Sequence, residues 1–341
     1  FNFGRGIDYE TNTYIDVNSF SNNYSIYSAM PIFDGFSNIY KIKMQKANEM
    51  AGKQQLEQQQ EMVAYETMEA FFNVLYYKKM VQLAQEQAEE SADIYNLTKQ
   101  KNLLTISIIL LKEKMNYPID QEFDIEENQP ETLIIKTNEA ASDIYETAKS
   151  INHNVLAAQS SLRAQQMNQR SALANFSPVV SMDAGISTGF AKYMDGSEYT
   201  SFSEQLKNKR GTYVGFTLSI PIFSGLSKIT SHNRSKAQVI IAQNELDETT
   251  RSLYSEIEQA VADMNGQADA YQQAVKQREA VETAHNANQR KYDEGLISPL
   301  ELHTSANRVV QSRAEEMNAE LQYRLKARLV RYYKGESFVI K

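Results

Sequence analysis

The chain contains one segment twice. Pro31-Ile32-Phe33-Asp34-Gly35-Phe36-Ser37-Asn38-Ile39 recurs as Pro221-Ile222-Phe223-Ser224-Gly225-Leu226-Ser227-Lys228-Ile229. Each copy follows a stretch in which apolar and polar residues alternate, which is the pattern of a strand with one apolar face. Each copy also precedes a long polar stretch without proline. A spacing this large is not that of a solenoid. It predicts a duplicated unit in which strands lead into a very long helix.

The alternating segments predict four strands. Residues 1–33 are expected to hold two strands with a turn at 19–23, and residues 178–223 two more, at 180–190 and 214–222, joined by a polar loop. Proline cannot donate to a strand ladder, so Pro31 and Pro221 are expected to end strands. Gly35 and Gly225 would relax the turn that follows. These four residues are therefore predicted to have a structural role, turning strand into helix.

Two long helices are predicted after the strands. In both copies the apolar residues return at steps of three and four, as in a coiled-coil seam. A helix from Ser37 to about Gln100, or from Ser227 to about Tyr292, would be roughly 95 Å long. The remaining segments are read as a helix over 140–176, an irregular connector over 116–139, a return helix that ends near 333 after a turn at 292–299, and a C-terminal segment over 334–341.

The first copy lacks a feature of the second. Aligning the duplicated segments places the helix turn of the second copy at positions 101–105 of the first, where no turn residues occur. We therefore expect 37–115 to hold the first long helix and only part of its return helix, with about twenty to twenty-five tip residues absent near 100/101. The alternative is a shorter first hairpin. By the same comparison, a helix equivalent to 140–175 is expected before Phe1.

Composition argues against several classes of function. The chain has 341 residues, no cysteine and a formal net charge of -8, which disfavours nucleic-acid binding and thiolate metal sites. Its four histidines are dispersed, and the sequence shows no glycine-rich phosphate loop. No nucleophile, base and orienting group can be assembled. The sequence therefore predicts a protein that is not an enzyme and has no cofactor and no metal site.

A sheet that crosses a bilayer must close into a barrel, because its backbone groups need partners. Four strands are too few, whereas three chains would supply twelve and leave room for a channel. The plan of strand, Pro-Ile-Phe-x-Gly and long helix, present twice, resembles the TolC family of outer-membrane efflux proteins over essentially the whole chain. The resemblance implies a homotrimer with a twelve-stranded barrel in the outer membrane and a coiled-coil helical tunnel in the periplasm. The connector and the C-terminal segment would form a band around that tunnel.

The resemblance also implies a function and partners. The chain would be a passive exit duct that receives substrates from an inner-membrane RND, ABC or MFS transporter through a periplasmic adaptor (membrane fusion) protein. Outer-membrane lipid would surround the barrel. A type I protein-secretion channel of the same fold is an alternative. A periplasmic helical-hairpin scaffold or adaptor is another, although the apolar faces of the predicted strands count against it.

The family narrows its tunnel at the helix tips, after a Tyr-x-x-Gly turn that is Tyr292-Asp293-Glu294-Gly295 here. In the family pattern, acidic residues six and nine positions after the glycine line the closed entrance. Glu301 matches the first position, whereas Thr304 departs from the second. Three Glu301 carboxylates around a narrow passage would favour cations. The alternative reading of Glu301 is a solvated helix residue. The charged turn is in the same way either an adaptor contact or merely solvated.

Overall fold

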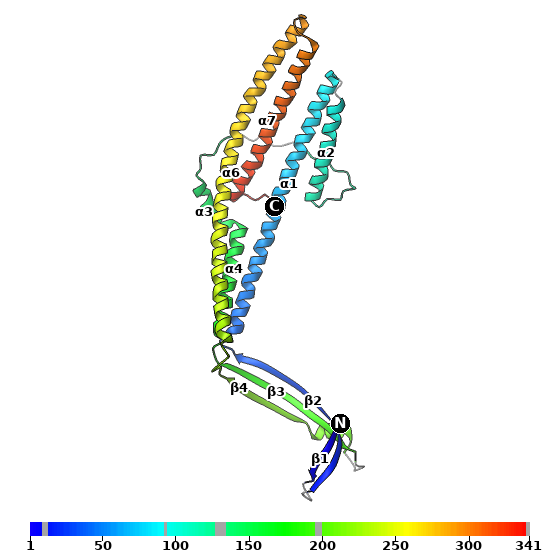
Figure 1. Ribbon diagram of the computed structural model, residues 1–341, viewed down its shortest axis with the longest axis vertical. Coiled ribbons are helices and arrows are strands. Elements are labelled where there is room, and N and C mark those ends of the chain that lie inside the picture. Colours follow the sequence, from blue (N-terminus) through cyan, green and yellow to red (C-terminus); the bar gives the residue numbers. More distant parts are fainter. Residues whose placement is uncertain (9–12, 92–93, 127–133, 195–199, 339–341) are drawn as a thin grey trace. The chain divides into compact units, whose positions relative to one another are not determined.

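The computed structural model describes residues 1–8, 13–91, 94–126, 134–194 and 200–338 (Figure 1). Parts of the predicted connector (127–133), strand loop (195–199) and C-terminal segment (339–341) lie outside the described residues. The chain forms two compact units, one of residues 1–46 and 163–240 and one of residues 47–162 and 241–341. Among the described helices, none is both long enough and apolar enough to cross a membrane.

The first unit is built on one antiparallel sheet with the strand order β1-β2-β3-β4 (Figure 1). Its strands are β1 (Asn2–Asp8), β2 (Thr13–Phe33), β3 (Val179–Tyr193) and β4 (Gly211–Ser219). The long β2 pairs first with β1 and then, from Ser19↔Tyr193 to Phe33↔Val180, with β3. The other side of β3 pairs with β4 from Val179↔Ser219 to Ser187↔Gly211.

The turn predicted at 19–23 is wrong. These residues lie within β2, where Ser19 is opposite Tyr193 and Asn22 is opposite Phe190. Serine and asparagine favour turns, but this preference is local, and pairing with β3 overrides it. The polar loop predicted between the last two strands also differs, because it contains the short helix α5 (Phe202–Asn208).

The two faces of the sheet differ in chemistry. Residues opposite one another in a ladder point to the same face. The apolar face, as we name it, carries cross-strand partners that are large and hydrophobic: Ile26, Met30, Met182, Ile186, Val214, Phe216 and Leu218. Met182 is half-buried and the other six side chains are exposed, with Ile26 at 76% and Phe216 at 70%. The opposite face, which we name the polar face, has mostly small and polar residues together with the exposed Tyr27 and Tyr213. There the Thr217 hydroxyl donates to Asp183 Oδ2 at 3.0 Å.

The duplicated segments fold alike. Gly35 and Phe36 have φ of 65° and 68°, and their counterparts Gly225 and Leu226 have φ of 59° and 67°. The next residue begins a helix in each case, α1 (Ser37–Ser91) and α6 (Ser227–Asp293). The repeat in sequence is therefore also a repeat of an uncommon backbone conformation, two successive left-handed residues.

Pro31 does not end its strand as expected. It pairs with Ser181, and β2 continues to Phe33 through a bulge between Pro31 and Phe33. A bulge is one of the few places where a sheet accepts a residue without an amide donor. Pro221 lies two positions beyond the end of β4 at Ser219.

In the second unit the first hairpin is shorter than predicted. Helix α1 ends at Ser91 rather than near Gln100, and α2 (Ile94–Lys114) runs through residues 100 and 101 without a break. The two helices pack through Leu111 against Val74 and Leu75. Near the tip, Asn96 Nδ2 donates to Gln87 Oε1 at 3.4 Å. The absence of tip residues near 100/101 stays a prediction, with the shorter hairpin as its alternative.

The helix predicted over 140–176 is two helices, α3 (Ala141–Ile151) and α4 (His153–Ala174). Asn152 between them is extended, and its side chain accepts from Val155 N at 3.2 Å. Asparagine is a strong N-cap residue, so it starts a new helix there.

The largest buried cluster joins α3 and α4 with α6 and α7 (Pro299–Tyr333). Its α6 members follow the three- and four-residue spacing seen in the sequence: Leu253, Ile257, Ala260, Met264 and Ala268.

Candidate functional site

The turn between α6 and α7 ends α6 with a Schellman motif. Leu296 N donates to Lys291 O at 2.7 Å and Gly295 N donates to Tyr292 O at 2.8 Å. Gly295 has φ of 76°, the left-handed conformation this motif requires. The Asp293 side chain is turned back onto α6, where it accepts from Gln289 Nε2 at 3.1 Å. The predicted turn Tyr292–Gly295 thus has a defined, hydrogen-bonded conformation at the end of α6.

Glu301 has a defined local role. Its carboxylate accepts from Ser298 N at 2.9 Å, while Glu301 N donates to Ser298 Oγ at 3.3 Å. These reciprocal bonds form a capping box with proline in the first turn of α7. Thr304, one turn further, donates its hydroxyl to Leu300 O at 2.8 Å. Both side chains are exposed near the tip.

Behind the tip, an ion-pair network links α6 to α7. Arg278 contacts Glu282 at 2.9 Å on its own helix and also contacts Glu316 on α7. Glu282 in turn forms an ion pair with Arg313, whose Nε lies 2.9 Å from Glu282 Oε1. The hydrogen bond from Arg313, with the charge of Arg278 beside it, lowers the pKa of Glu282. The network fixes the two helices of this hairpin side by side.

The hairpins α1/α2 and α6/α7 also touch one another. The Gln87 amide on α1 donates to Asn307 Oδ1 on α7. Arg313 on α7 lies 4.0 Å from Glu86 of α1. We name these two contacts the inter-hairpin tie. Both lie within the second unit, in the N-terminal half of α7.

The connector predicted over 116–139 ends in an extended segment, residues 134–139, which we name the strap. Tyr323 of α7 holds it at Ile135, donating its hydroxyl to Ile135 O at 2.7 Å and accepting from Ile135 N at 3.1 Å. Asn265 of α6 holds it at Thr137 through a second reciprocal pair at 3.0 and 3.2 Å. The strap is therefore clipped to both helices by side-chain amide and hydroxyl groups.

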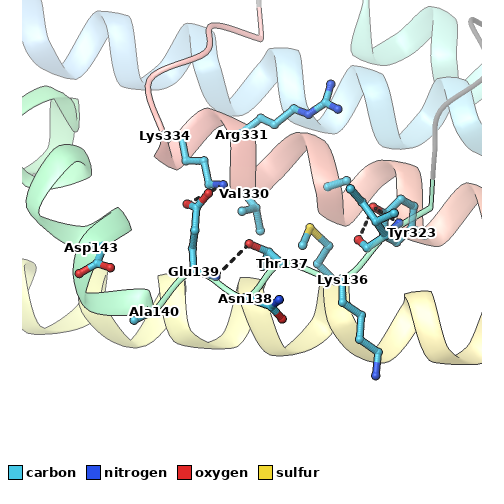
Figure 2. Close-up of a pocket in the computed structure, with 13 residues that line it drawn as sticks. Lys136, Thr137, Asn138, Glu139, Ala140, Asp143, Tyr323, Val330, Arg331 and Lys334 are labelled. Carbon is cyan, nitrogen blue, oxygen red and sulfur yellow. Dashed lines mark hydrogen bonds and ion pairs between the residues drawn. The ribbon is translucent and has the colours of Figure 1, made fainter.

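Figure 2 shows the strap crossing a cavity of about 1080 Å³ over α6 and α7. Glu139 and Lys334 point toward one another at its edge, with a 2.7 Å ion pair. Lys136 extends out of the cavity, where it pairs with Asp269 at 2.6 Å. The lining mixes apolar side chains with charged ones, and among the charged ones Lys136, Glu139 and Lys334 are in ion pairs.

A cluster of acids and tyrosines lies at the end of α7. Tyr332 donates to Glu61 Oε2 at 2.7 Å, and Glu61 also lies 3.4 Å from His153 Nε2. The neighbouring Tyr333 donates to Glu256 at 3.4 Å. Burial, together with the adjoining carboxylates, raises the pKa of Tyr332 and of Tyr333. Burial also raises the pKa of Glu256, against the opposing effect of its hydrogen bond from Tyr333.

Sequence reasoning missed this cluster, because Glu61 and Tyr332 are far apart in the chain and neither belongs to a motif. The feature that they share in the sequence is a polar side chain on a helix face that otherwise carries the apolar residues of a coiled-coil seam. The described residues contain no group of three potential ligands able to hold a metal ion.

The junction residues belong to the first unit. A Cβ added at Gly35 would lie 2.5 Å from Ser177 Cβ and 2.7 Å from Ala174 O. At Gly225 the same atom would meet open space. Beside Gly35, Ser37 is buried and its hydroxyl lies 3.1 Å from Ser171 Oγ. The start of α1 is thus packed tightly against the end of α4.

Solved structures share the fold of the whole chain. The open-state MtrE outer membrane channel of Neisseria gonorrhoeae is 15% identical, with a TM-score of 0.74 over 98% of this chain and 78% of that one. The CmeC outer membrane channel of Campylobacter jejuni is 14% identical, with a TM-score of 0.67 over 100% and 78%. The outer membrane protein VceC of Vibrio cholerae is 14% identical, with a TM-score of 0.63 over 99% and 86%.

Sequence comparison places the chain in a family. No curated protein sequence matches it. The family described as outer membrane efflux protein matches residues 144–332, more than half of the chain. This match agrees with the resemblance carried by the duplicated segments, and the structural neighbours are channels of the same TolC-like group. The chain belongs to the outer membrane efflux protein family.

Proposed function

We propose that this chain is the outer-membrane exit duct of a tripartite efflux system. Substrates would enter from an inner-membrane RND, ABC or MFS transporter and a periplasmic adaptor, and leave through the outer membrane without energy input from the duct. Membership of the outer membrane efflux protein family supports this proposal. The observation that carries it is the exposed apolar face of the sheet.

The apolar face is suited to lipid. Strands of nine to eleven residues are enough to cross a bilayer at the usual tilt, and β2, β3 and β4 have 21, 15 and 9 residues. Alternation of lipid-facing hydrophobic residues with small, polar lumen-facing residues is the pattern of a membrane barrel. Large exposed hydrophobic side chains such as Ile26, Val214 and Phe216 would be a liability in water.

The sheet needs further strands. Within the described sheet, β1 pairs only with β2 and β4 only with β3, so both outer edges have unpaired backbone groups. Such edges are costly in hydrocarbon, and copies of the same chain can cover them. Three copies would give twelve strands, enough for a water-filled interior rather than one filled by side chains. We therefore propose a homotrimer with its helices in the periplasm.

The tip of α6/α7 would form the constriction. Three copies of Glu301, held by their capping boxes, would form a ring of carboxylates, with Thr304 one turn further along. The hydrogen-bonded turn Tyr292–Gly295 would meet the adaptor. Leu296 and Leu300 beside it are 68% and 73% exposed, which suits a protein contact better than a solvated turn.

Planar-bilayer recording of the full-length protein tests the proposal. We expect a trimer in detergent that forms cation-selective pores, and a Glu301→Gln variant whose selectivity for cations is reduced. Glutamine still completes a capping box, so this substitution removes charge while the start of α7 is kept.

Other outcomes would change the proposal. A chain that is soluble without detergent and forms no pores would favour the helical scaffold instead. Pores that are indifferent to Glu301→Gln would keep the duct but move its constriction away from this ring. Comparing drug sensitivity and protein secretion in a deletion strain would separate efflux from type I secretion.

A further inference from the structure

Helix α5 lies on the apolar face of the sheet. Its Phe202 ring is 5.2 Å from Phe190 and 6.4 Å from Tyr24, measured between ring centroids. Thr188, opposite Tyr24 in the ladder, donates its hydroxyl to Leu206 O at 2.7 Å. Thr188, Phe190 and Tyr24 share the face that carries Ile26 and Ile186. The helix therefore covers the same side that we propose faces lipid.

Gln205 fixes α5 to the sheet. Its side chain is 6% exposed and pairs with the backbone of Ala191, accepting from Ala191 N at 3.1 Å and donating to Ala191 O at 2.9 Å. Ala191 lies beyond Ser187, where the pairing of β3 with β4 ends. The amide thus takes the place of a strand partner at this edge. Because these groups are buried and paired, α5 is a docked element with a defined orientation.

Aromatic side chains extend the contact into a belt. The ring centroid of Phe20 lies 5.1 Å from that of Phe1 and 6.2 Å from that of Phe190. Phe190 in turn packs against Phe202. Membrane barrels carry such girdles where the hydrocarbon meets the headgroups. Strands β2 and β4 run into α1 and α6 at the other end of the sheet. If those helices are periplasmic, this belt marks the outer leaflet.

Basic residues follow the belt. Lys207, Lys209 and Arg210 are exposed at the C-terminal end of α5, while its one acid, Glu204, lies in the first turn. Lys209 Nζ is held 2.7 Å from Gln205 Oε1, which places it beside Ala191. Lys192 adds a fourth cation on the same face as Phe20 and Phe190. Beyond an aromatic girdle, the headgroup layer is the next environment of such residues.

We propose that α5 is an interfacial helix whose basic end binds the phosphate groups of an outer-leaflet glycolipid. Lysine and arginine form charge-assisted hydrogen bonds to phosphate, and basic residues near an anionic surface strengthen binding to it. The acyl chains of the same lipid would cover Ile26, Ile186 and Val214. This inference rests on the proposed function, since it needs the apolar face to be in the outer membrane.

Lipid titration of the full-length protein in neutral detergent tests the inference, with bound lipid counted by native mass spectrometry. The probes are diphosphorylated lipid A, its monophosphorylated form and inorganic phosphate. The variant is Lys207→Gln/Arg210→Gln, which leaves Lys209 on Gln205. The control, Lys236→Gln/Arg251→Gln, removes two exposed charges from α6. We expect the variant to bind diphosphorylated lipid A at least about tenfold more weakly, and the control to bind like the unchanged protein.

Two results would overturn the inference: equal binding of diphosphorylated lipid A by variant and unchanged protein, or inorganic phosphate competing as well as the lipid does. The inference would be supported if the variant lost less affinity for monophosphorylated lipid A than for the diphosphorylated form. Conductance of the same preparations separates this test from the proposed function. Pores that conduct while the variant binds lipid normally would reject only the lipid site, whereas protein that never forms pores would reject the duct itself.

Discussion

At the residue scale, the two junction glycines share a conformation but not their surroundings. Gly35 and Gly225 both have left-handed φ. A Cβ atom added at Gly35 would lie within 3 Å of neighbouring atoms, whereas one added at Gly225 would meet open space. We expect Gly225→Ala to cost about 1–2 kcal/mol from conformation alone. Gly35→Ala should cost about 1–3 kcal/mol more, because Ser177 and Ala174 must move. Thermal unfolding in detergent measures the order of the two variants.

Gly52 provides the control for this comparison. It lies inside α1 with open space at its Cβ position and without a left-handed φ. Gly52→Ala is expected to raise stability slightly, because alanine favours a helix interior by about 1 kcal/mol. Equal destabilisation by Gly35→Ala and Gly225→Ala would mean that the atoms around Gly35 can move to admit a Cβ atom without a loss of folding free energy.

Glu301 combines a structural bond with a charge, and two substitutions separate them. Glu301→Ala removes the capping box with Ser298 and is expected to cost about 1 kcal/mol at the start of α7. Glu301→Gln should leave stability nearly unchanged. If the carboxylate ring sets selectivity, both variants should alter it to the same extent in bilayer recordings. A change in selectivity only with alanine would assign the effect to the cap.

At the element scale, the strap depends on α6 and α7 for its backbone partners. Tyr323, which is 3% exposed, satisfies both the N–H and the C=O of Ile135. Tyr323→Phe keeps the packing but removes both bonds, at an expected cost of about 1–3 kcal/mol. Hydrogen exchange should then be faster at Ile135, with Thr137 still protected by Asn265. Unchanged exchange at Ile135 would show that the strap is held by packing alone.

The buried tyrosines at the end of α7 predict that the folded protein loses stability at alkaline pH. Burial raises the pKa of Tyr332 and of Tyr333 above the unfolded value near 10. Their stabilising contribution is therefore complete below pH 10 and is lost as pH rises toward the folded pKa. The melting temperature should fall more steeply above pH 10 than in Tyr332→Phe/Tyr333→Phe. Tyr95→Phe, at an exposed site, is the matched control and should follow the unchanged protein.

The elements differ in how well the sequence predicts them. The seam of α6 follows from its spacing, because Leu253, Ile257 and Ala260 are buried by neighbouring helices whatever the details. The start of α4 cannot be predicted from spacing, because the helical pattern is continuous there and a single N-cap residue, Asn152, sets where the new helix begins. Helix α5 was missed because it is short and takes its stability from Gln205 and Phe202 docking on the sheet.

The candidate site shows the same division. Gly295 and the Ser298–Glu301 capping box are local signals that can be read from the chain, since each depends on residues three or four apart. The acid and tyrosine cluster depends on partners 271 residues apart and needs the tertiary structure. Contacts of this kind carry no periodic signature in a single sequence.

At the scale of the whole molecule, duplication has produced two unequal hairpins. Helices α1 and α2 have 55 and 21 residues, whereas α6 and α7 have 67 and 35. The shorter hairpin meets the longer one at the inter-hairpin tie, the contacts Gln87–Asn307 and Glu86–Arg313. A tie at this place holds α7 close to α1 a few turns from Glu301, so it bears on the width of the proposed constriction.

Asn307→Ala should therefore widen the entrance. The substitution removes the acceptor of the Gln87 amide but leaves the Arg278–Glu282–Arg313 network within the longer hairpin. We expect single-channel conductance to rise severalfold, because α7 loses a contact that holds it to α1. Asn288→Ala, which removes only a contact to Ser305 inside the same hairpin, is the matched control and should conduct normally. Equal conductance of both variants would place the restraint on the entrance elsewhere, either in the ring of Glu301 or between neighbouring copies of the chain.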